Sequence, residues 1–213
     1  AAAYASFANG GVYTTPRTYT EVKDHNGNTI LENKTESHVA MKESTAYAMN
    51  ELLKNVVRSG TGTGANFSGM TIAGKTGSTN SNNDRYFVGY TPYYTAAVWV
   101  GYDTPTRIVA SGNPAATLWK TFMSKVHANL PNKDFDVSSG DMVSVTVCTQ
   151  TGLLASSYCP AQTVKVASDH VPTLTCDAHM SVNLCADSGM LASDYCPNVT
   201  TGYVLDLSQP NVS

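Results

Sequence analysis

In the first part of the chain, apolar residues recur at spacings typical of a short helix, then a hairpin, then a longer helix. Residues 1–9 fit a helix that a Gly-Gly pair ends. The dipeptide Asn26-Gly27, between two β-prone runs, indicates a hairpin turn. A second helix is expected over 44–58, with Ser44 as its N-cap. Its apolar stripe comprises Ala46, Met49, Leu52, Leu53, Val56 and Val57.

The next apolar runs alternate as strands do. Strands are expected over 70–77, 84–91 and 94–102, and the short turns between them predict antiparallel neighbours. A last helix is expected over 114–129, with Asn113-Pro114 as its cap and first residue. Its core-facing stripe comprises Leu118, Trp119, Phe122, Met123, Val126 and Leu130. This pattern predicts an α+β fold in which an antiparallel sheet packs on helices.

The first of these strands runs into a cation, a small hydroxyl and a glycine, Lys75-Thr76-Gly77, followed by Ser78. Such a strand margin can receive the anionic end of a peptide. Lys75 supplies charge, Ser78 supplies a hydroxyl and a backbone N–H, and Gly77 lets a ligand backbone approach. The sequence therefore predicts a site that binds a carboxylate.

The same letters also match a phosphate-binding loop, Gly69-x-x-x-x-Gly74-Lys75-Thr76. That motif requires a Gly-rich loop that opens a helix, whose N-terminus faces the phosphates. Here residues 70–73 read as strand and residues 77–83 form a poor helix start. Nucleotide binding is therefore disfavoured, and Lys75 at the start of a helix would revive it.

Composition limits the partners. Of the 213 residues 14% are charged and the net charge is −3, so nothing favours nucleic acid or an anionic membrane surface. The run 94–102 is too short to span a bilayer. The chain opens within a helix and has no initiator Met, so we expect a piece of a longer polypeptide with no membrane contact of its own.

After an expected linker over 130–141, the chain repeats itself. Residues 144–160 and 181–197 are identical at 10 of 17 positions, which indicates a tandem duplication. We expect a first domain at 1–133, one repeat at 141–178 and a second at 179–213. Each repeat is expected to form strand, turn and strand.

All five cysteines lie in the repeats, and Cys148 and Cys159 have the same spacing as Cys185 and Cys196. A module this small cannot bury enough apolar area to be stable alone. Disulfides Cys148–Cys159 and Cys185–Cys196 are the simplest solution, and they imply an oxidising, extracytoplasmic setting.

The alternative to disulfides is a zinc site made of Cys148, Cys159, Cys176 and His179. No Cys-x-x-Cys pair is present, so the metal-ligand spacing is weak. The sequence therefore favours disulfides and no metal, with Cys176 left unpaired.

Five stretches of the first part of the chain form one ordered set: residues 4–13, 58–64, 73–80, 87–92 and 97–103. Together they resemble the C-terminal half of the transpeptidase domain of class A penicillin-binding proteins, the bifunctional cell-wall synthases. The similarity spans about residues 1–130, and the tail is similar to tails of some such proteins in Gram-positive bacteria.

The resemblance implies a serine-type D,D-transpeptidase that needs no cofactor and acts on peptidoglycan stem peptides, with β-lactams as mimics. Lys-Thr-Gly is the third of three family motifs; the other two, Ser-x-x-Lys with the nucleophile and Ser-x-Asn, lie upstream of Ala1 by family order. No serine of this chain has a lysine three residues later. The chain alone is therefore expected to be inactive.

By the same resemblance, Lys75, Thr76 and Ser78 hold the terminal carboxylate, Gly77 keeps the strand edge open to the substrate, and Lys75 and Ser78 also assist catalysis. The intact protein is expected at the extracytoplasmic face of the bacterial cell membrane. Its anchor and glycosyltransferase domain would lie in an N-terminal part absent from this chain, which would also be its partner. The alternative is a non-catalytic cell-wall binding or structural module.

Overall fold

The computed structural model describes residues 1–136 and 141–205. The chain divides after Gly140 into two compact units, and each is described by itself. Part of the predicted linker, residues 137–140, and residues 206–213 of the second repeat lie outside the described residues. Within the described part of the chain, no helix has the length and apolarity needed to cross a membrane.

The first unit is built around a three-stranded antiparallel sheet. Its order is β5 (Ala73–Ser78), β6 (Arg85–Tyr90) and β7 (Thr95–Val100), which confirms the predicted antiparallel neighbours. The register places Lys75 opposite Val88 and Ser78 opposite Arg85. Strand β5 lies at an edge of this sheet, so one side of its backbone is not paired within it.

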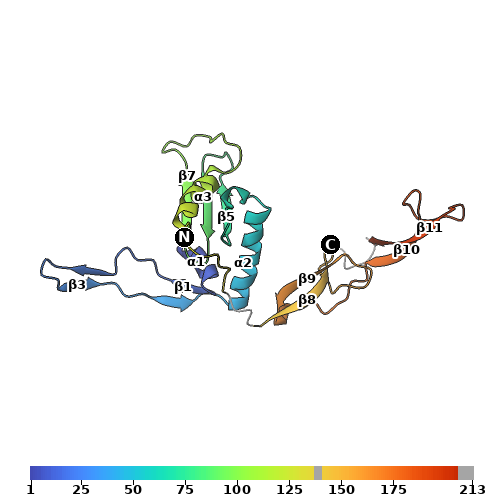
Figure 1. Cartoon of the computed structure of the whole chain (residues 1–213), viewed down its shortest axis with the longest axis horizontal. Helices are drawn as coiled ribbons and strands as arrows, with labels where there is room; N and C mark the ends of the chain where they lie inside the picture. Colours follow the sequence, from blue (N-terminus) through green and yellow to red (C-terminus); the bar gives the residue numbers. More distant parts are fainter. Residues whose placement is uncertain (137–140, 206–213) are drawn as a thin grey trace. The chain divides into compact units, whose positions relative to one another are not determined.

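Helices α1 (Ala2–Ala8), α2 (Glu43–Arg58) and α3 (Pro114–Val126) pack against this sheet. Helix α2 lies along β5, and α3 packs on β6 and β7 (Figure 1). The main core joins Phe87, Trp119 and Val57, and the rings of Phe87 and Trp119 meet edge to face at 5.3 Å. The predicted α+β fold, an antiparallel sheet packed on helices, is confirmed.

A second core cluster consists of Leu53, Ala73 and Tyr90, and the buried polar residue Asn50 is hydrogen-bonded beside it. Asn50 on α2 donates to the carbonyl oxygen of Phe7 at 3.0 Å, and the Tyr90 hydroxyl donates to Asn50 Oδ1 at 2.7 Å. Burial raises the pKa of Tyr90 well above its usual range, so this hydroxyl keeps its proton. These bonds connect α1, α2 and β6.

Two details predicted for α2 are wrong. The helix begins at Glu43 and Lys42 occupies the cap position, so Ser44 is not the N-cap. Leu52 was placed in the core stripe but is 63% exposed. Because successive helical residues point about 100° apart, Leu52 faces away when Leu53 faces the sheet.

For α3 the start was predicted correctly and the stripe only in part. Asn113 Oδ1 accepts hydrogen bonds from the N–H groups of Ala115 and Ala116 at 2.9 and 3.4 Å, and Pro114 is the first helical residue. Trp119 is fully buried. Other members of the stripe are exposed, because α3 contacts the rest of the unit along one narrow face. The small residues Ala115 and Ala116 are part of that buried face. The exposed ones are Leu118 (53%), Phe122 (59%) and Val126 (39%).

Two small pairs of strands complete the first unit. Strands β1 (Val12–Thr14) and β4 (Ser37–Val39) pair, and β2 (Glu21–Lys23) pairs with β3 (Thr29–Glu32). The predicted hairpin turn is confirmed: Gly27 has φ of 87°, a conformation that glycine adopts at no steric cost.

The second unit consists of two antiparallel hairpins, as predicted for the repeats. They are formed by β8 (Met142–Cys148) with β9 (Ala161–Ala167) and by β10 (His179–Cys185) with β11 (Val199–Leu205). The turn after β8 recurs after β10: Gly152 and Gly189 have φ of 73° and 70°. Asn198 is one extra residue in the second repeat, because Cys148 pairs with Ala161 while Cys185 pairs with Val199.

Candidate functional site

The predicted carboxylate-binding residues lie on the edge strand β5. Lys75 is exposed, and its ammonium donates to the Thr76 carbonyl at 3.0 Å and lies 3.5 Å from Thr76 Oγ1. Lys75 forms no ion pair with the described residues, so its charge is available to a ligand. The absence of a side chain at Gly77 lets β6 approach, since a Cβ there would come 3.2 Å from the Cβ of Tyr86.

A cavity of 370 Å³ opens beside this strand. Its walls come from β5, from β6, from the Gly-rich segment after α2 and from the segment that leads into α3. Every lining residue is neutral or cationic: Thr61, Thr76, Ser78, Arg85, Ala110, Gly112 and Asn113. Such a cavity suits an anionic group.

The Gly-rich segment at 60–64 contributes Thr61 to the wall of the cavity. The hydroxyls of Thr61 and Thr76 share a hydrogen bond of 2.8 Å. Thr61 therefore sets the orientation of the Thr76 hydroxyl. Nothing in the sequence indicated this contact, because the two residues lie fifteen positions apart.

Arg85 is the main residue that the sequence analysis missed. Its Nη1 donates to Ser78 Oγ at 2.9 Å across the β5–β6 pair, and its Nε is buried without a hydrogen-bond partner among the described residues. Opposite residues of an antiparallel pair point to the same face, so Arg85 is held beside Ser78. A guanidinium there adds a second positive charge suited to a carboxylate.

Asn113 positions the far wall of the cavity. Besides capping α3, its side chain donates through Nδ2 to the carbonyl of Tyr86 at 3.0 Å. One amide thus joins the start of α3 to β6. The cap was readable from the sequence, but the bond to the sheet was not.

The phosphate-loop alternative fails on geometry. Lys75 and Thr76 lie inside β5, and the chain passes through a turn into β6 rather than into a helix. No helix N-terminus therefore follows the Gly-Lys-Thr letters to face a phosphate.

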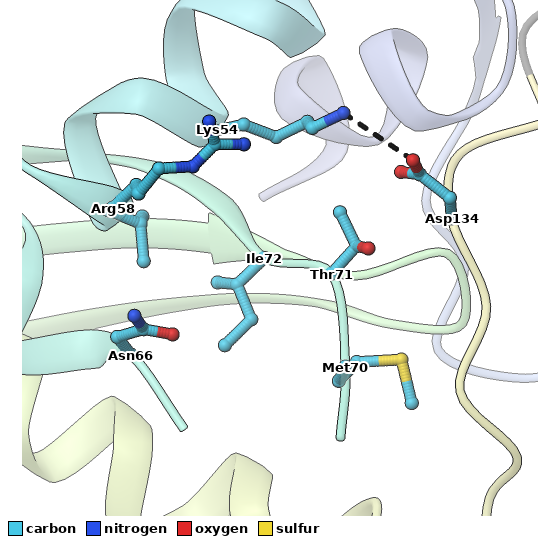
Figure 2. Close-up of a pocket in the computed structure, with 8 residues that line it drawn as sticks. Lys54, Arg58, Asn66, Met70, Thr71, Ile72 and Asp134 are labelled. Carbon is cyan, nitrogen blue, oxygen red and sulfur yellow. Dashed lines mark ion pairs between the residues drawn. The ribbon is translucent and has the colours of Figure 1, made fainter. Parts of the chain in front are cut away.

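A separate cavity of 260 Å³ lies between α2 and the segment that leads into β5 (Figure 2). Lys54 and Arg58 project from α2 toward it, and Lys54 Nζ pairs with Asp134 at 3.5 Å. It shares no lining residue with the cavity beside β5.

The predicted disulfides are not present. All five cysteines are free thiols, including the pairs Cys148 with Cys159 and Cys185 with Cys196. The thiols of Cys148 and Cys159 converge with that of Cys176 on one histidine, His179, instead of pairing with each other. The expectation of no metal is also at odds with this arrangement, because the four side chains together could hold an ion.

Comparison with known proteins identifies the family of this chain. Residues 1–124 match the family model described as penicillin binding protein transpeptidase domain, and residues 139–181 match the C-terminal domain of penicillin-binding protein 1A. The chain belongs to the penicillin-binding protein transpeptidase family.

Relatives of the 1A type within that family confirm the resemblance to class A proteins. The chain is 43% identical over 141 residues to penicillin-binding protein 1A of Clostridium acetobutylicum, covering 66% of this chain and 17% of that protein. It is 37% identical over 192 residues to the 1A protein of Clostridium tetani, covering 84% and 24%. The chain therefore spans less than a quarter of the length of these two relatives.

Solved structures agree on the fold. Penicillin-binding protein 1A of Haemophilus influenzae superposes with a TM-score of 0.68 at 20% identity, over 82% of this chain and 32% of that one. The D,D-transpeptidase domain of a peptidoglycan glycosyltransferase from Eggerthella lenta gives 0.51 at 24% identity, over 60% and 30%.

Proposed function

We propose that this chain supplies the carboxylate-binding side of a serine-type D,D-transpeptidase that cross-links peptidoglycan stem peptides. The observation that carries this is the acid-free cavity beside β5, where Arg85 provides charge and Thr76 and Ser78 provide hydroxyls. Lys75 does not line the cavity, but its ammonium lies 3.5 Å from the Thr76 hydroxyl and adds positive charge beside it. Family membership and the 1A relatives support it.

The edge position of β5 suits an extended substrate. A peptide that ends in D-Ala-D-Ala can lie along the unpaired side of β5 as an added strand, with its backbone hydrogen-bonded to the strand. Its terminal carboxylate then reaches the cationic end of the cavity. Gly77 leaves the strand free of a side chain where the peptide backbone comes closest.

The reaction would proceed in two acyl transfers. A serine hydroxyl from outside the given residues attacks the penultimate D-Ala carbonyl carbon, the C–N bond breaks, and D-Ala leaves with a proton on its nitrogen. An amine of a second peptide then attacks the ester, forms the cross-link and returns the serine. The Ser78 N–H would donate to the carbonyl oxygen while it carries negative charge, as half of an oxyanion hole.

The remaining proposals follow from this one. β-Lactams would occupy the same cavity, because they present a carboxylate beside an electrophilic carbonyl. The site would act on the extracytoplasmic side of the bacterial membrane, with the anchor, the nucleophile and a glycosyltransferase domain on the rest of the protein. No cofactor is needed for either acyl transfer.

Labelling with a fluorescent penicillin tests the proposal. We expect no covalent label on this 213-residue chain and strong labelling of a protein that continues upstream of Ala1. In the longer protein, Lys75→Ala and Ser78→Ala should slow labelling strongly. Covalent label on the short chain would show that the nucleophile is not missing from it. Normal labelling of both variants would remove Lys75 and Ser78 from the carboxylate-binding site, and no labelling of the longer protein would favour the wall-binding alternative.

A further inference from the structure

Three sulfur atoms and one imidazole nitrogen meet inside the second unit. The Nδ1 of His179 lies 3.7 Å from Cys148 Sγ, 3.5 Å from Cys159 Sγ and 3.3 Å from Cys176 Sγ. All four atoms lie within 4.8 Å of one another. They come from the end of β8, the turn before β9, the loop before β10 and the first residue of β10.

These distances match a tetrahedral zinc site. With Zn–S of about 2.3 Å and Zn–N of about 2.0 Å, the sulfur-to-nitrogen edge of a tetrahedron is about 3.5 Å. The three observed sulfur-to-nitrogen distances, 3.3, 3.5 and 3.7 Å, agree with that value to within about 0.2 Å. Three cysteines and one histidine are also a common ligand set of structural zinc.

Hydrogen bonding alone explains the cluster poorly. A neutral imidazole nitrogen without a proton has one lone pair and can accept one S–H donor, so it cannot bond three thiols at once. A disulfide between any two of the sulfurs would leave only the third thiol to bond the imidazole. One central cation binds all four atoms.

The tautomer of His179 is set from the other side of the ring. Its Nε2 lies 2.7 Å from Gln150 Oε1, and an amide oxygen can only accept, so Nε2 carries the proton. The Nδ1 lone pair is therefore directed at the three sulfurs. A ligating histidine held by a hydrogen bond to its second nitrogen is the usual support of a zinc ligand.

Backbone N–H groups support the sulfur atoms as thiolates. Gln150 donates to Cys148 Sγ and Ser156 donates to Cys159 Sγ, both at 3.4 Å. Cys148, Cys176 and His179 are buried. A thiolate buried without a counter-charge is costly, and a dication in the centre removes that cost.

We propose that Cys148, Cys159, Cys176 and His179 bind one Zn²⁺ in a closed structural site. Binding forms three Zn–S bonds and one Zn–N bond and releases the three thiol protons to solvent, so the site carries a net charge of −1. The site does not depend on the proposed transpeptidase function.

The second repeat supplies a matched control. Cys185 and Cys196 occupy the positions of Cys148 and Cys159, and Ser193 donates to Cys196 Sγ at 3.4 Å as Ser156 does to Cys159. No third cysteine and no histidine joins them among residues 141–205. This pair should not hold zinc as a four-ligand site.

The test is metal analysis of the full 213-residue chain after purification with Zn²⁺ and removal of unbound metal. We expect about one Zn²⁺ per chain, and intense visible bands of tetrahedral, thiolate-ligated cobalt when Co²⁺ replaces it. Cys176→Ser should reduce the metal content to near zero. The double variant Cys185→Ser with Cys196→Ser should keep about one ion per chain.

Thiol titration keeps the proposal testable if Cys176→Ser does not fold. In the zinc-loaded chain Cys148, Cys159 and Cys176 should be protected, so at most Cys196 and, more slowly, the buried Cys185 should react. All five thiols should react after chelation. Two disulfides in the mass spectrum, five reactive thiols without chelator, or full metal content in Cys176→Ser would each overturn the proposal.

Discussion

The two units of this chain contrast in what fills their interiors. In the first, Trp119 and Phe87 meet between a sheet and its helices, and large apolar side chains form the core. In the second, the largest buried cluster of the described residues centres on Cys148, Cys176 and Ala178. A sheet that helices cover buries enough apolar area to be stable, whereas two hairpins do not, so the second unit needs a cross-link.

This comparison predicts that a chelator acts on one unit only, which is the largest effect. Removing zinc should reduce hydrogen-exchange protection in β8 and β10 by roughly two orders of magnitude or more, because binding free energy of a structural zinc is folding free energy. Strands β5–β7 should keep their protection. Exchange measured by mass spectrometry on the full chain checks this, and equal loss in both units would contradict it.

The reverse experiment removes the core of the first unit. Trp119→Ala should destabilise that unit by about 3–5 kcal/mol, because it opens a cavity where the side chain is fully buried. The neighbouring Leu118→Ala is the matched control and should change stability by less than about 0.5 kcal/mol, since Leu118 is exposed. Denaturant-induced unfolding, monitored by hydrogen exchange in β6, measures the change in stability of both variants. The zinc content of both variants should equal that of the unchanged chain.

Catalytic function should follow the first unit alone. In the longer protein, Arg85→Ala should slow acylation by penicillin about 10- to 100-fold, the loss of a charge-assisted hydrogen bond to the ligand carboxylate. Arg85→Lys should recover part of the rate, because it keeps the charge without the planar donor pair. Stopped-flow labelling measures the rate, and an unchanged rate in Arg85→Ala would remove this residue from the site.

An effect of similar size is expected at the hydrogen bond that supports the zinc ligand His179 in the second unit. Gln150→Ala should weaken zinc binding about 10- to 100-fold, because the imidazole loses the partner that fixes its tautomer. Asp187 occupies the equivalent position in the second repeat, and Asp187→Ala should leave zinc affinity unchanged. Competition with a chromophoric chelator measures both, and equal effects of the two changes would contradict the assignment.

Features encoded by neighbouring residues could be predicted. Asn113-Pro114 identified the start of α3, Asn26-Gly27 identified a hairpin, and short turns identified the antiparallel sheet. Lys75, Thr76, Gly77 and Ser78 are consecutive, so their strand could be recognised as a candidate site. The repeat was visible because its two copies share ten of seventeen residues.

What the sequence could not supply depends on distant contacts. Arg85 reaches Ser78 only through the β5–β6 register, and Leu118 and Phe122 are exposed because α3 packs along a narrow face. The predicted disulfides Cys148–Cys159 and Cys185–Cys196 were wrong for the same reason. Equal spacing in both repeats suggested two separate cross-links, but the chain brings Cys176 and His179 from other segments to the first pair.

His179 begins the second hairpin, yet its side chain completes the cluster of the first copy. The two halves of the duplication are therefore not interchangeable pieces that could be excised one at a time. A chain cut after residue 178 would keep every cysteine of the first copy and lose the only nitrogen donor of the set. The shortest self-sufficient form of this tail thus includes at least His179, the first residue of the second hairpin.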